Sequence, residues 1–198
     1  MKNPLFLTLL LTMLFLGTVS AEAANHYVRA GATGANNGSS WTDAWTTFPS
    51  GTTYIRGDEY YVADGTYSGG YTFSTSASGT TTIKVCKATV STVGSCSTAH
   101  GSDTDWLDTY GDGQAVFTGT GINMSSAYWI FDGVVGDGSR STAGSNPVTY
   151  GFYLTPPNSG STIRPVQFGG SNVQFRHVAV TCPGSTGDIQ QFGYSGFG

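Results

Sequence analysis

The sequence predicts an all-β solenoid, in which the chain winds through successive coils of short strands. Its composition, with 29 Gly, 11 Tyr, 11 Phe and only 10% charged residues, suits strands and turns better than amphipathic surface helices. The stretch Gly57–Phe73 (GDEYYVADGTYSGGYTF) has the pattern of a strand, a tight turn at Asp64-Gly65 and a second strand. Because β-forming segments and Gly/Asn/Asp/Ser turns alternate in the same way downstream, we interpret this stretch as the first full coil.

A signal peptide precedes the folded domain, at residues 1–24. Lys2 supplies a short positive region, Leu5–Leu16 an apolar run, and Ala21-Glu22-Ala23 a small-x-small cleavage signal. The apolar run is short for a membrane span, so an uncleaved anchor is the less favoured alternative. We therefore expect a mature protein that is secreted to the extracellular space or the periplasm and has no membrane association after cleavage.

The start of the mature domain is expected to be an N-terminal cap at residues 25–56. Asn25–Ala30 has the pattern of an opening strand. Ser40 and Asp43 form the capping-box pattern of a helix start. A short helix over Trp41–Phe48 would then present Trp41, Ala44, Trp45 and Phe48 at helical spacing. Such an aromatic-faced helix would cover the exposed end of a solenoid core.

Coils are expected over residues 57–198, interrupted by a loop insertion at 86–113. The predicted strands are Tyr60–Ala63, Thr80–Val85, Ala115–Thr118, Ile122–Met124, Tyr128–Val135, Gly151–Leu154, Pro165–Phe168 and Asn172–Val180.

Two of these segments, YWIFDGVVGDG and NVQFRHVAV, resemble each other in register. Each has a midpoint break, at Asp132-Gly133 in the first and at Arg176-His177 in the second, followed by valines. Phe131 and Phe175 are 175 − 131 = 44 positions apart, which predicts two coils of about 20–25 residues each. Asn172 tolerates a left-handed backbone, and we expect it to stack with like residues on adjacent coils.

Export makes the three cysteines informative, because an oxidising compartment favours disulfides. Cys86 and Cys96 lie close together in a segment rich in Ser, Thr and Gly, and we predict that they pair. Cys182 is left over; it is either buried and inert or paired with a cysteine beyond residue 198. The spacing of the cysteines does not fit a zinc site.

The predicted loop insertion carries four carboxylates, at Asp103, Asp105, Asp108 and Asp112. Carboxylate oxygens are the ligands that Ca²⁺ prefers. The spacing differs from the calcium-loop pattern, because Leu107 occupies a position that requires an oxygen ligand. We favour a solvated acidic loop and keep a Ca²⁺ site at these four residues as the alternative.

The last segment, Asp188–Gly198 (DIQQFGYSGFG), contains neither a capping helix nor a polar terminal coil. A solenoid that ended there would expose strand edges and core. We therefore expect an incomplete, C-terminally truncated solenoid.

Four segments carry a resemblance to a known family: HYVRAGATGANNGSSWTDAW, GDEYYVADGTYSGGYTF, YGDGQAVFTG and YWIFDG. Together they resemble the N-terminal region of secreted right-handed parallel β-helix proteins of the pectate-lyase-like superfamily. The resemblance covers essentially all of the mature chain and implies a right-handed parallel β-helix domain at residues 25–198, with a short N-terminal capping helix. It implies less about function, because this fold hosts polysaccharide lyases, hydrolases, esterases, epimerases and non-catalytic surface proteins.

Lyases of this superfamily typically use Ca²⁺ to acidify a uronate C5 proton, with Arg or Lys as the base. No motif carries such a role to a residue of this chain; the segment Trp129–Asp132 resembles a Trp-Ile-Asp-His signature, but with an extra Phe and with Gly133 in place of the His. The candidate catalytic residues are Arg176, His177 and Asp132. His177 is either a general base beside a cation or part of an outward-facing strand corner without a catalytic role.

Two functions remain open at this point. The first is a secreted protein that binds or degrades an extracellular, acidic polysaccharide in the manner of a polysaccharide lyase, with Ca²⁺ as the implied cofactor. The second is a non-catalytic surface, matrix or adhesin-type protein. A net charge of −4 gives no basic surface for nucleic acid, so we expect no nucleic-acid partner.

Overall fold

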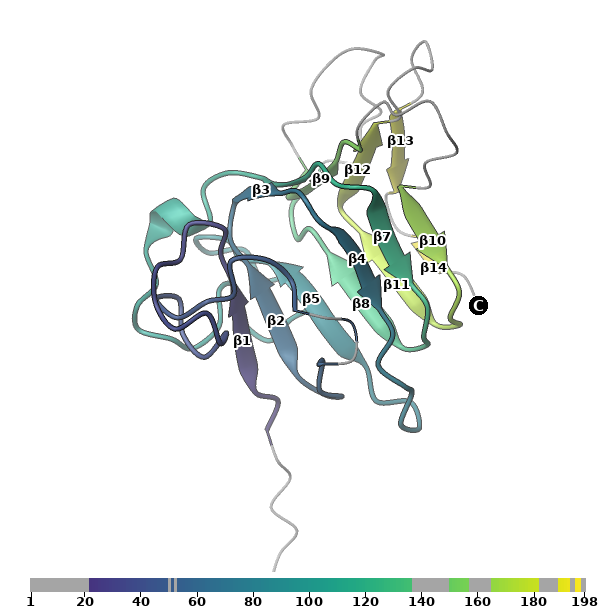
Figure 1. The fold of residues 1–198 in the computed structure, drawn as a ribbon, viewed down its shortest axis with the longest axis horizontal. Helices are drawn as coiled ribbons and strands as arrows, with labels where there is room; N and C mark the ends of the chain where they lie inside the picture. The colour runs from purple at the N-terminus through teal and green to yellow at the C-terminus, as the bar shows by residue number, and fades with distance from the viewer. Residues whose placement is uncertain are drawn as a thin grey trace, which may run out of the picture.

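A computed structural model describes residues 22–49, 51, 53–136, 150–156, 165–181, 189–192 and 195–196 of the chain, the last two segments by their backbone alone. These residues form three β-sheets (Figure 1). Their long-range strand pairs are parallel except for the two strands nearest the C-terminus, which pair antiparallel. The prediction of an all-β fold is confirmed, with parallel sheets. The predicted signal peptide up to Ala21, and Cys182, lie outside the described residues.

Each sheet gathers strands that are far apart in the sequence. Sheet A consists of β1 (Asn25–Val28), β2 (Glu59–Val62), β5 (Ile83–Lys87), β8 (Trp129–Asp132), β11 (Val173–Arg176) and β14 (Ser195–Gly196). Sheet B consists of β3 (Gly65–Tyr67), β6 (Ala115–Phe117), β9 (Phe152–Leu154), β12 (Val178–Thr181) and β13 (Ile189–Phe192). Sheet C consists of β4 (Gly70–Phe73), β7 (Gly121–Met124) and β10 (Val166–Phe168).

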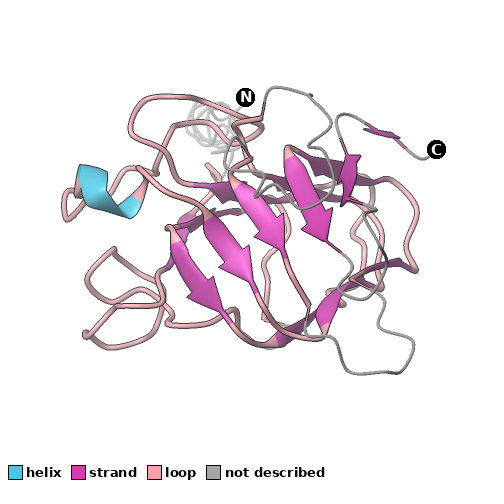
Figure 2. Cartoon of the chain, turned by 90° about the horizontal axis from the view of Figure 1, so that it is seen from above, coloured by secondary structure: helices cyan, strands magenta, loops and turns pink. Residues whose placement is uncertain are grey.

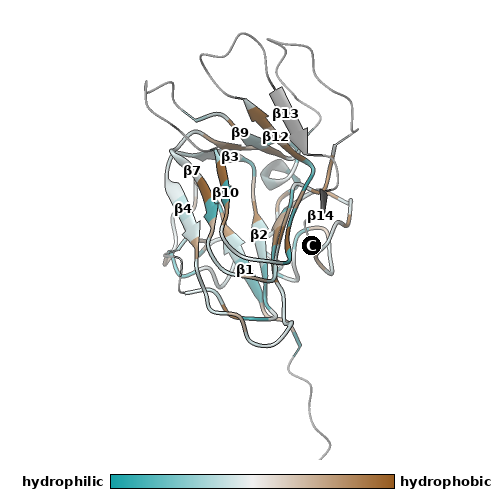
Figure 3. Cartoon of the chain, turned by 90° about the vertical axis from the view of Figure 1, so that its right-hand side faces the viewer, coloured by the Kyte–Doolittle hydropathy of each residue, from teal (hydrophilic) through white to brown (hydrophobic). Residues whose placement is uncertain are grey.

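The chain visits the sheets in the order A, B, C and then returns to sheet A. It makes this round as β2-β3-β4, β5-β6-β7 and β8-β9-β10, and begins another with β11-β12. Every parallel strand pairs with the strand that the previous round left in the same sheet. Seen from the side, the sheets enclose a common interior, with apolar and polar residues alternating along β7 and β10 (Figure 3).

Equivalent inward positions form rows of buried side chains that cross the strands. In sheet A one such row is Tyr60, Val85, Phe131 and Phe175, each no more than 1% exposed. In sheet B, Tyr67 pairs with Phe117 and Phe117 with Leu154. Because successive residues of a strand point to opposite faces, these rows fill the interior while their neighbours form the outer face.

The spacing of Phe131 and Phe175 was predicted to span two coils, and this is wrong. The two residues are direct partners on β8 and β11, so 44 residues make a single round. The preceding rounds take 85 − 60 = 25 and 131 − 85 = 46 residues, from the pairs Tyr60–Val85 and Val85–Phe131. Long insertions at the turns lengthen the later rounds, because loop length is limited far less than strand register.

The helix predicted at Trp41–Phe48 is also absent. Its capping contact forms, with the Asp43 N–H donating to Ser40 Oγ at 2.9 Å, but the next residues run beside β1. Trp45 exchanges backbone hydrogen bonds with Tyr27 and Arg29 and bridges to Val28. Trp41, Ala44 and Phe48 are still buried and Trp45 is partly buried, so the segment covers the edge of sheet A as a series of bends around one bridge residue, Trp45. A short 3₁₀ turn, η1 (Asp108–Tyr110), projects beside the sheets in Figure 2.

The two similar segments differ after their breaks. β11 continues into β12 across His177 alone, as predicted, whereas β8 ends at Asp132 and sheet B resumes only at Phe152. Asn172 has the predicted left-handed backbone, with φ of 53°. Its equivalent on the previous round is Tyr128, also left-handed with φ of 62°, so the expected stack of like residues is not formed.

Candidate functional site

Within the described chain, acidic and basic side chains gather at the edge where the chain passes from sheet A to sheet B, here called the A–B corner. Each turn at this edge follows the C-terminal end of a sheet A strand. Asp64 follows β2, Lys87 ends β5, Asp132 ends β8 and His177 separates β11 from β12. Parallel strands end at the same edge of a sheet, so the topology gathers these side chains from positions 113 residues apart in the sequence (177 − 64).

Asp132 and His177 form a hydrogen-bonded pair at this corner. His177 Nδ1 lies 2.7 Å from Asp132 Oδ1, and the two side chains are 39% and 2% exposed, respectively. Burial alone would raise the pKa of Asp132, but hydrogen bonds from Ser95, from His177 and from the Val134 N–H outweigh it and hold that pKa below its usual value. Asp132 is therefore a carboxylate, and a carboxylate only accepts hydrogen bonds.

The charge of Asp132 decides which imidazole nitrogen carries the proton. Because a carboxylate can only accept, His177 Nδ1 donates to Oδ1, which also accepts from the Val134 N–H at 2.8 Å. The neutral imidazole then has an unprotonated Nε2. A buried carboxylate behind a half-exposed imidazole with Nε2 as acceptor is the arrangement that orients a general base.

The backbone on both sides of this pair is in an uncommon conformation. Val134 and His177 have φ of 68° and 50°, in the left-handed region that β-branched and bulky side chains rarely adopt. Gly133 sits between them, and a Cβ there would lie 2.0 Å from the His177 carbonyl oxygen. Such strain persists only where the surroundings enforce it, and it is concentrated at functional sites.

The three catalytic candidates from the sequence are brought together here. Asp132 and Arg176 are direct partners in the register of β8 and β11, and His177 follows Arg176. The Arg176 Nη1 donates to Ser95 Oγ at 3.0 Å, and Ser95 Oγ donates to Asp132 Oδ2 at 2.6 Å. Arg176 thus places a cation beside the pair. Ser95 was not predicted, because its role depends on contacts with β8, which is 37 residues away.

Ser95 belongs to a segment, residues 94–103, that crosses the outer face of sheet A and is here called the strap. It contacts β8, β5, β2 and β1 in turn. The predicted disulfide Cys86–Cys96 is confirmed and ties the strap to β5. The other anchors are Ser95 on Asp132, Ser97 on Glu59, Thr98 on Tyr61 Oη, and the Ser102 and Asp103 N–H groups on Tyr27 Oη. The strap covers the outer face of the sheet, where the buried carboxylates lie.

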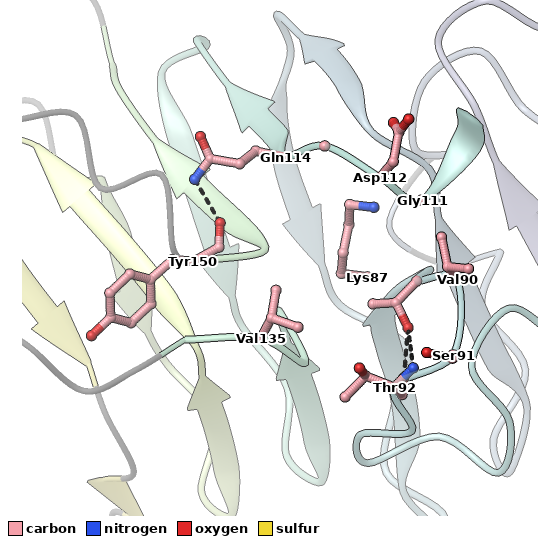
Figure 4. Close-up of a pocket in the computed structure, with 11 residues that line it drawn as sticks. Lys87, Val90, Ser91, Thr92, Gly111, Asp112, Gln114, Val135 and Tyr150 are labelled. Carbon is pink, nitrogen blue, oxygen red and sulfur yellow. Dashed lines mark hydrogen bonds between the residues drawn. The ribbon is translucent and has the colours of Figure 1, made fainter. Parts of the chain in front are cut away.

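A pocket of about 260 Å³ opens at the same corner, and neither Asp132 nor His177 is among the residues that line it (Figure 4). Its lining residue Tyr150 and the His177 ring both lie close to Gly136. A Cβ at Gly136 would be 2.9 Å from Tyr150 Cδ1 and 3.4 Å from His177 Cδ2. The polar groups of its wall come from Lys87, Thr89, Ser91, Thr92, Asp112 and Gln114.

Lys87 is the charged group at the base of this pocket. It is 1% exposed, and its Nζ donates to the Ala88 carbonyl oxygen at 2.5 Å. Burial lowers the pKa of Lys87 from 10.5 to about 8, although the carboxylates of Asp64 and Asp112 act in the opposite direction. In Figure 4 the Lys87 side chain points toward Asp112. A lysine with a pKa near neutrality exchanges protons readily at mild pH.

Asp64 and Asp112 form a carboxyl pair next to Lys87. Burial raises the pKa of Asp64, and the hydrogen bond and negative charge of Asp112 raise it further, against the opposing effects of Lys87 and the Gly113 N–H. The corner therefore combines a carboxyl pair, a buried amine and an oriented imidazole.

Three of the four predicted calcium ligands make separate contacts, and the fourth, Asp105, is exposed. Asp103 Oδ2 accepts from the Trp41 N–H, Asp108 Oδ1 accepts from Trp106 Nε1, and Asp112 faces Asp64. Among the described residues there is no group of three or more His, Cys, Asp or Glu side chains that could hold a metal ion. The calcium interpretation gains no support from this geometry.

A second His–Asp pair, His26 with Asp58, provides a useful comparison. His26 Nε2 lies 2.8 Å from Asp58 Oδ2, but its ring stacks against both Trp45 and Tyr60, at centroid distances of 5.6 and 4.6 Å. Its side chain is 19% exposed, against 39% for His177. The position of His26 fits a role in packing, whereas the His177 side chain is about twice as exposed.

No protein-family model, curated protein or solved structure matches this chain. Within the part of the chain that the structure describes, no helix has the length and apolar character to cross a bilayer. The chemistry of the A–B corner must therefore be argued from its own geometry.

The low pKa of Lys87 predicts a particular pH dependence of stability. Since the unfolded chain holds this proton up to about pH 10.5 and the folded chain releases it near pH 8, folding is favoured increasingly as pH rises through that window. We expect wild-type stability to rise relative to Lys87→Met by about 2–3 kcal/mol between pH 7 and pH 10. Urea unfolding of both proteins at several pH values measures the difference; parallel pH curves would contradict the prediction.

Proposed function

We propose that this chain folds as a right-handed parallel β-helix and that the protein is secreted. The repeated visits to sheets A, B and C, in register from one round to the next, support the β-helix. The disulfide Cys86–Cys96 supports an oxidising compartment, in agreement with the signal-peptide pattern at residues 1–24.

The function that the A–B corner supports best is proton transfer to or from an extracellular polysaccharide, in an acidic region of the polymer. The observation that carries this proposal is the Asp132–His177 pair, with Nδ1 held at 2.7 Å from a buried carboxylate and the imidazole 39% exposed. The pocket at the same corner, which neither residue of the pair lines, has the hydroxyl and amide groups that suit a sugar ring. Arg176 supplies the positive charge that attracts a uronate carboxylate.

The reaction class that uses these groups is β-elimination. His177 Nε2 takes the proton from the carbon next to the uronate carboxylate, and the electrons of that C–H bond form a C=C bond. The bond between the next carbon and the glycosidic oxygen breaks, and the departing oxygen takes a proton from solvent. Arg176 stabilises the negative charge that develops on the carboxylate in the transition state.

An absorbance assay tests this proposal directly. Purified protein is incubated with a panel of polyuronates, with and without Ca²⁺, and the formation of unsaturated products is followed in the ultraviolet. We expect a time-dependent rise with at least one acidic polymer and none with a neutral glucan. A flat trace on every polyuronate, from protein with an intact disulfide, would count against the lyase activity.

One observation favours a second function, a non-catalytic surface or matrix protein. Asp132 is held by Ser95 in the same way as Glu59 is held by Ser97, with N–H and hydroxyl contacts of 2.9 and 2.6 Å in both cases. On this hypothesis Asp132 is an anchor for the strap, and its contact with His177 is structural. Polysaccharide binding without product formation would support this alternative.

A further inference from the structure

Ser95 and Ser97 flank the strap cysteine, and each holds a different buried carboxylate. The Ser95 N–H and hydroxyl both donate to Asp132 Oδ2, and the Ser97 N–H and hydroxyl both donate to Glu59 Oε2. The Cys96–Cys86 bond lies between these two contacts. The strap therefore makes two contacts of the same chemistry, separated by one covalent anchor.

The two carboxylates differ in the partners of their second oxygen, Glu59 Oε1 and Asp132 Oδ1. Glu59 Oε1 accepts from Lys84 Nζ at 3.0 Å, in an ion pair at the sheet surface. Asp132 Oδ1 accepts from the Val134 N–H and faces His177 Nδ1. Because Ser95 occupies Oδ2 with two donors, the imidazole has only Oδ1 available, and this fixes the rotation of both the carboxylate and the ring.

We propose that Ser95 is a positioning residue for His177, acting through Asp132 and secured by the Cys86–Cys96 bond. The inference rests on the proposed function for its catalytic meaning, but its physical content is the coupling of a strap hydroxyl to an imidazole on the other side of a carboxylate. Ser97 has no such path to an imidazole, so it is the matched control. The charged or titratable groups that face His177 from the described residues are Asp132, the neighbouring Arg176, and Tyr150 across Gly136.

The coupling predicts a change in the hydrogen bond between His177 and Asp132. Removing the Ser95 hydroxyl frees one lone-pair site on Asp132 Oδ2, so the rotation of the carboxylate and of the imidazole is no longer fixed. We expect Ser95→Ala to move the NMR resonances of the His177 imidazole at a fixed pH, whereas Ser97→Ala leaves them unchanged. Both variants lose one hydroxyl contact to a buried carboxylate, and Ser95→Ala also loses the contact of its hydroxyl with Arg176 Nη1 at 3.0 Å. We therefore expect decreases in thermal midpoint of about 4–8 °C, with the larger decrease for Ser95→Ala.

The experiment records the NMR imidazole resonances of the full chain at one fixed pH. The His177 resonance is assigned by its absence in His177→Gln, and Ser95→Thr, which keeps the hydroxyl, is expected to restore the wild-type chemical shift. An unshifted His177 resonance in Ser95→Ala, or equal shifts in the alanine variants of Ser95 and Ser97, would overturn the proposal. So would a Ser95→Ala chain that fails to fold while Ser97→Ala folds, because Ser95 would then be purely structural. The measurement needs no substrate, so its outcome is independent of the polyuronate assay.

Discussion

Replacing His177 with alanine is expected to reduce the polyuronate-cleaving activity proposed for this protein by about 10²–10⁴-fold, the usual contribution of a positioned general base. The loss should appear in kcat with little change in KM. His177 acts on the proton that is transferred in the transition state, and the pocket groups that bind the sugar remain in place. Initial rates of unsaturated-product formation over a range of polymer concentrations separate the two constants.

His26 supplies a matched control for that experiment. It is also a histidine in contact with a carboxylate, but its ring is stacked against Trp45 and Tyr60. His26→Ala should therefore lower stability without a specific loss of kcat in the fraction that remains folded. Equal activity losses in the two variants would mean that the effect of His177→Ala is structural, and would favour the non-catalytic function.

A substitution at Asp132 provides a second test of the same hypothesis. Asp132→Asn removes the charge behind the imidazole, and the amide would accept from Nδ1–H only in one orientation. We expect Asp132→Asn to lower kcat in the same direction as His177→Ala, because the tautomer with Nε2 as acceptor is no longer enforced.

The features that the sequence predicts well are those set by local chemistry. The left-handed backbone at Asn172, the break at Arg176-His177, and the pairing of Cys86 with Cys96 depend on a few neighbouring residues. The positions of the strands are predictable for the same reason, because the alternation of apolar and polar residues along four or five positions is a local pattern. The burial of Trp41 and Phe48 was also predictable, because large aromatic side chains seek the core in either a helix or an extended segment.

The features that sequence reasoning missed depend on pairing between distant strands. The helix predicted at Trp41–Phe48 does not form, because Trp45 makes backbone hydrogen bonds with β1 instead. Helix propensity describes only neighbouring residues and does not account for such long-range hydrogen bonds. The length of a round was wrong because insertions at the turns leave the register of Phe131 with Phe175 unaffected. The sequence did not indicate that Lys87 is buried, because a single lysine in a strand pattern is normally at the surface.

The candidate site lies between these two cases. Asp132, Arg176 and His177 were selected by residue type, yet the hydrogen bond that gives them a joint role requires β8 and β11 to be adjacent. A sequence pattern identifies Asp132 and His177 as candidates, but it does not show that the two side chains lie within hydrogen-bond distance. Ser95, which completes the arrangement, is 81 residues from Arg176 and lies in a loop that no strand pattern describes.

The largest effect on stability is expected for Phe131→Ala. Phe131 is fully buried on β8 and contacts rings from all three sheets. Its ring centroid lies 4.5 Å from that of Phe152, 4.9 Å from Phe175, 5.8 Å from Phe117 and 6.1 Å from Phe73. Truncation removes apolar contact and leaves a cavity that rigid strands cannot close, at a cost of about 3–5 kcal/mol. The free energy of unfolding of typical domains is about 5–15 kcal/mol, so Phe131→Ala would remove a large fraction of the total stability.

Ile130→Ala is the control for this variant, because Ile130 is the preceding residue on β8 and lies half-buried on the outer face of the sheet. We expect it to cost about 1 kcal/mol or less, in proportion to the smaller area it buries. Urea unfolding of both variants and of Phe131→Leu, followed by tyrosine and tryptophan fluorescence, ranks the three substitutions, with Phe131→Leu between the others. Comparable losses at positions 130 and 131 would contradict a core that is built from inward rows, and with it the register that joins Asp132 to His177.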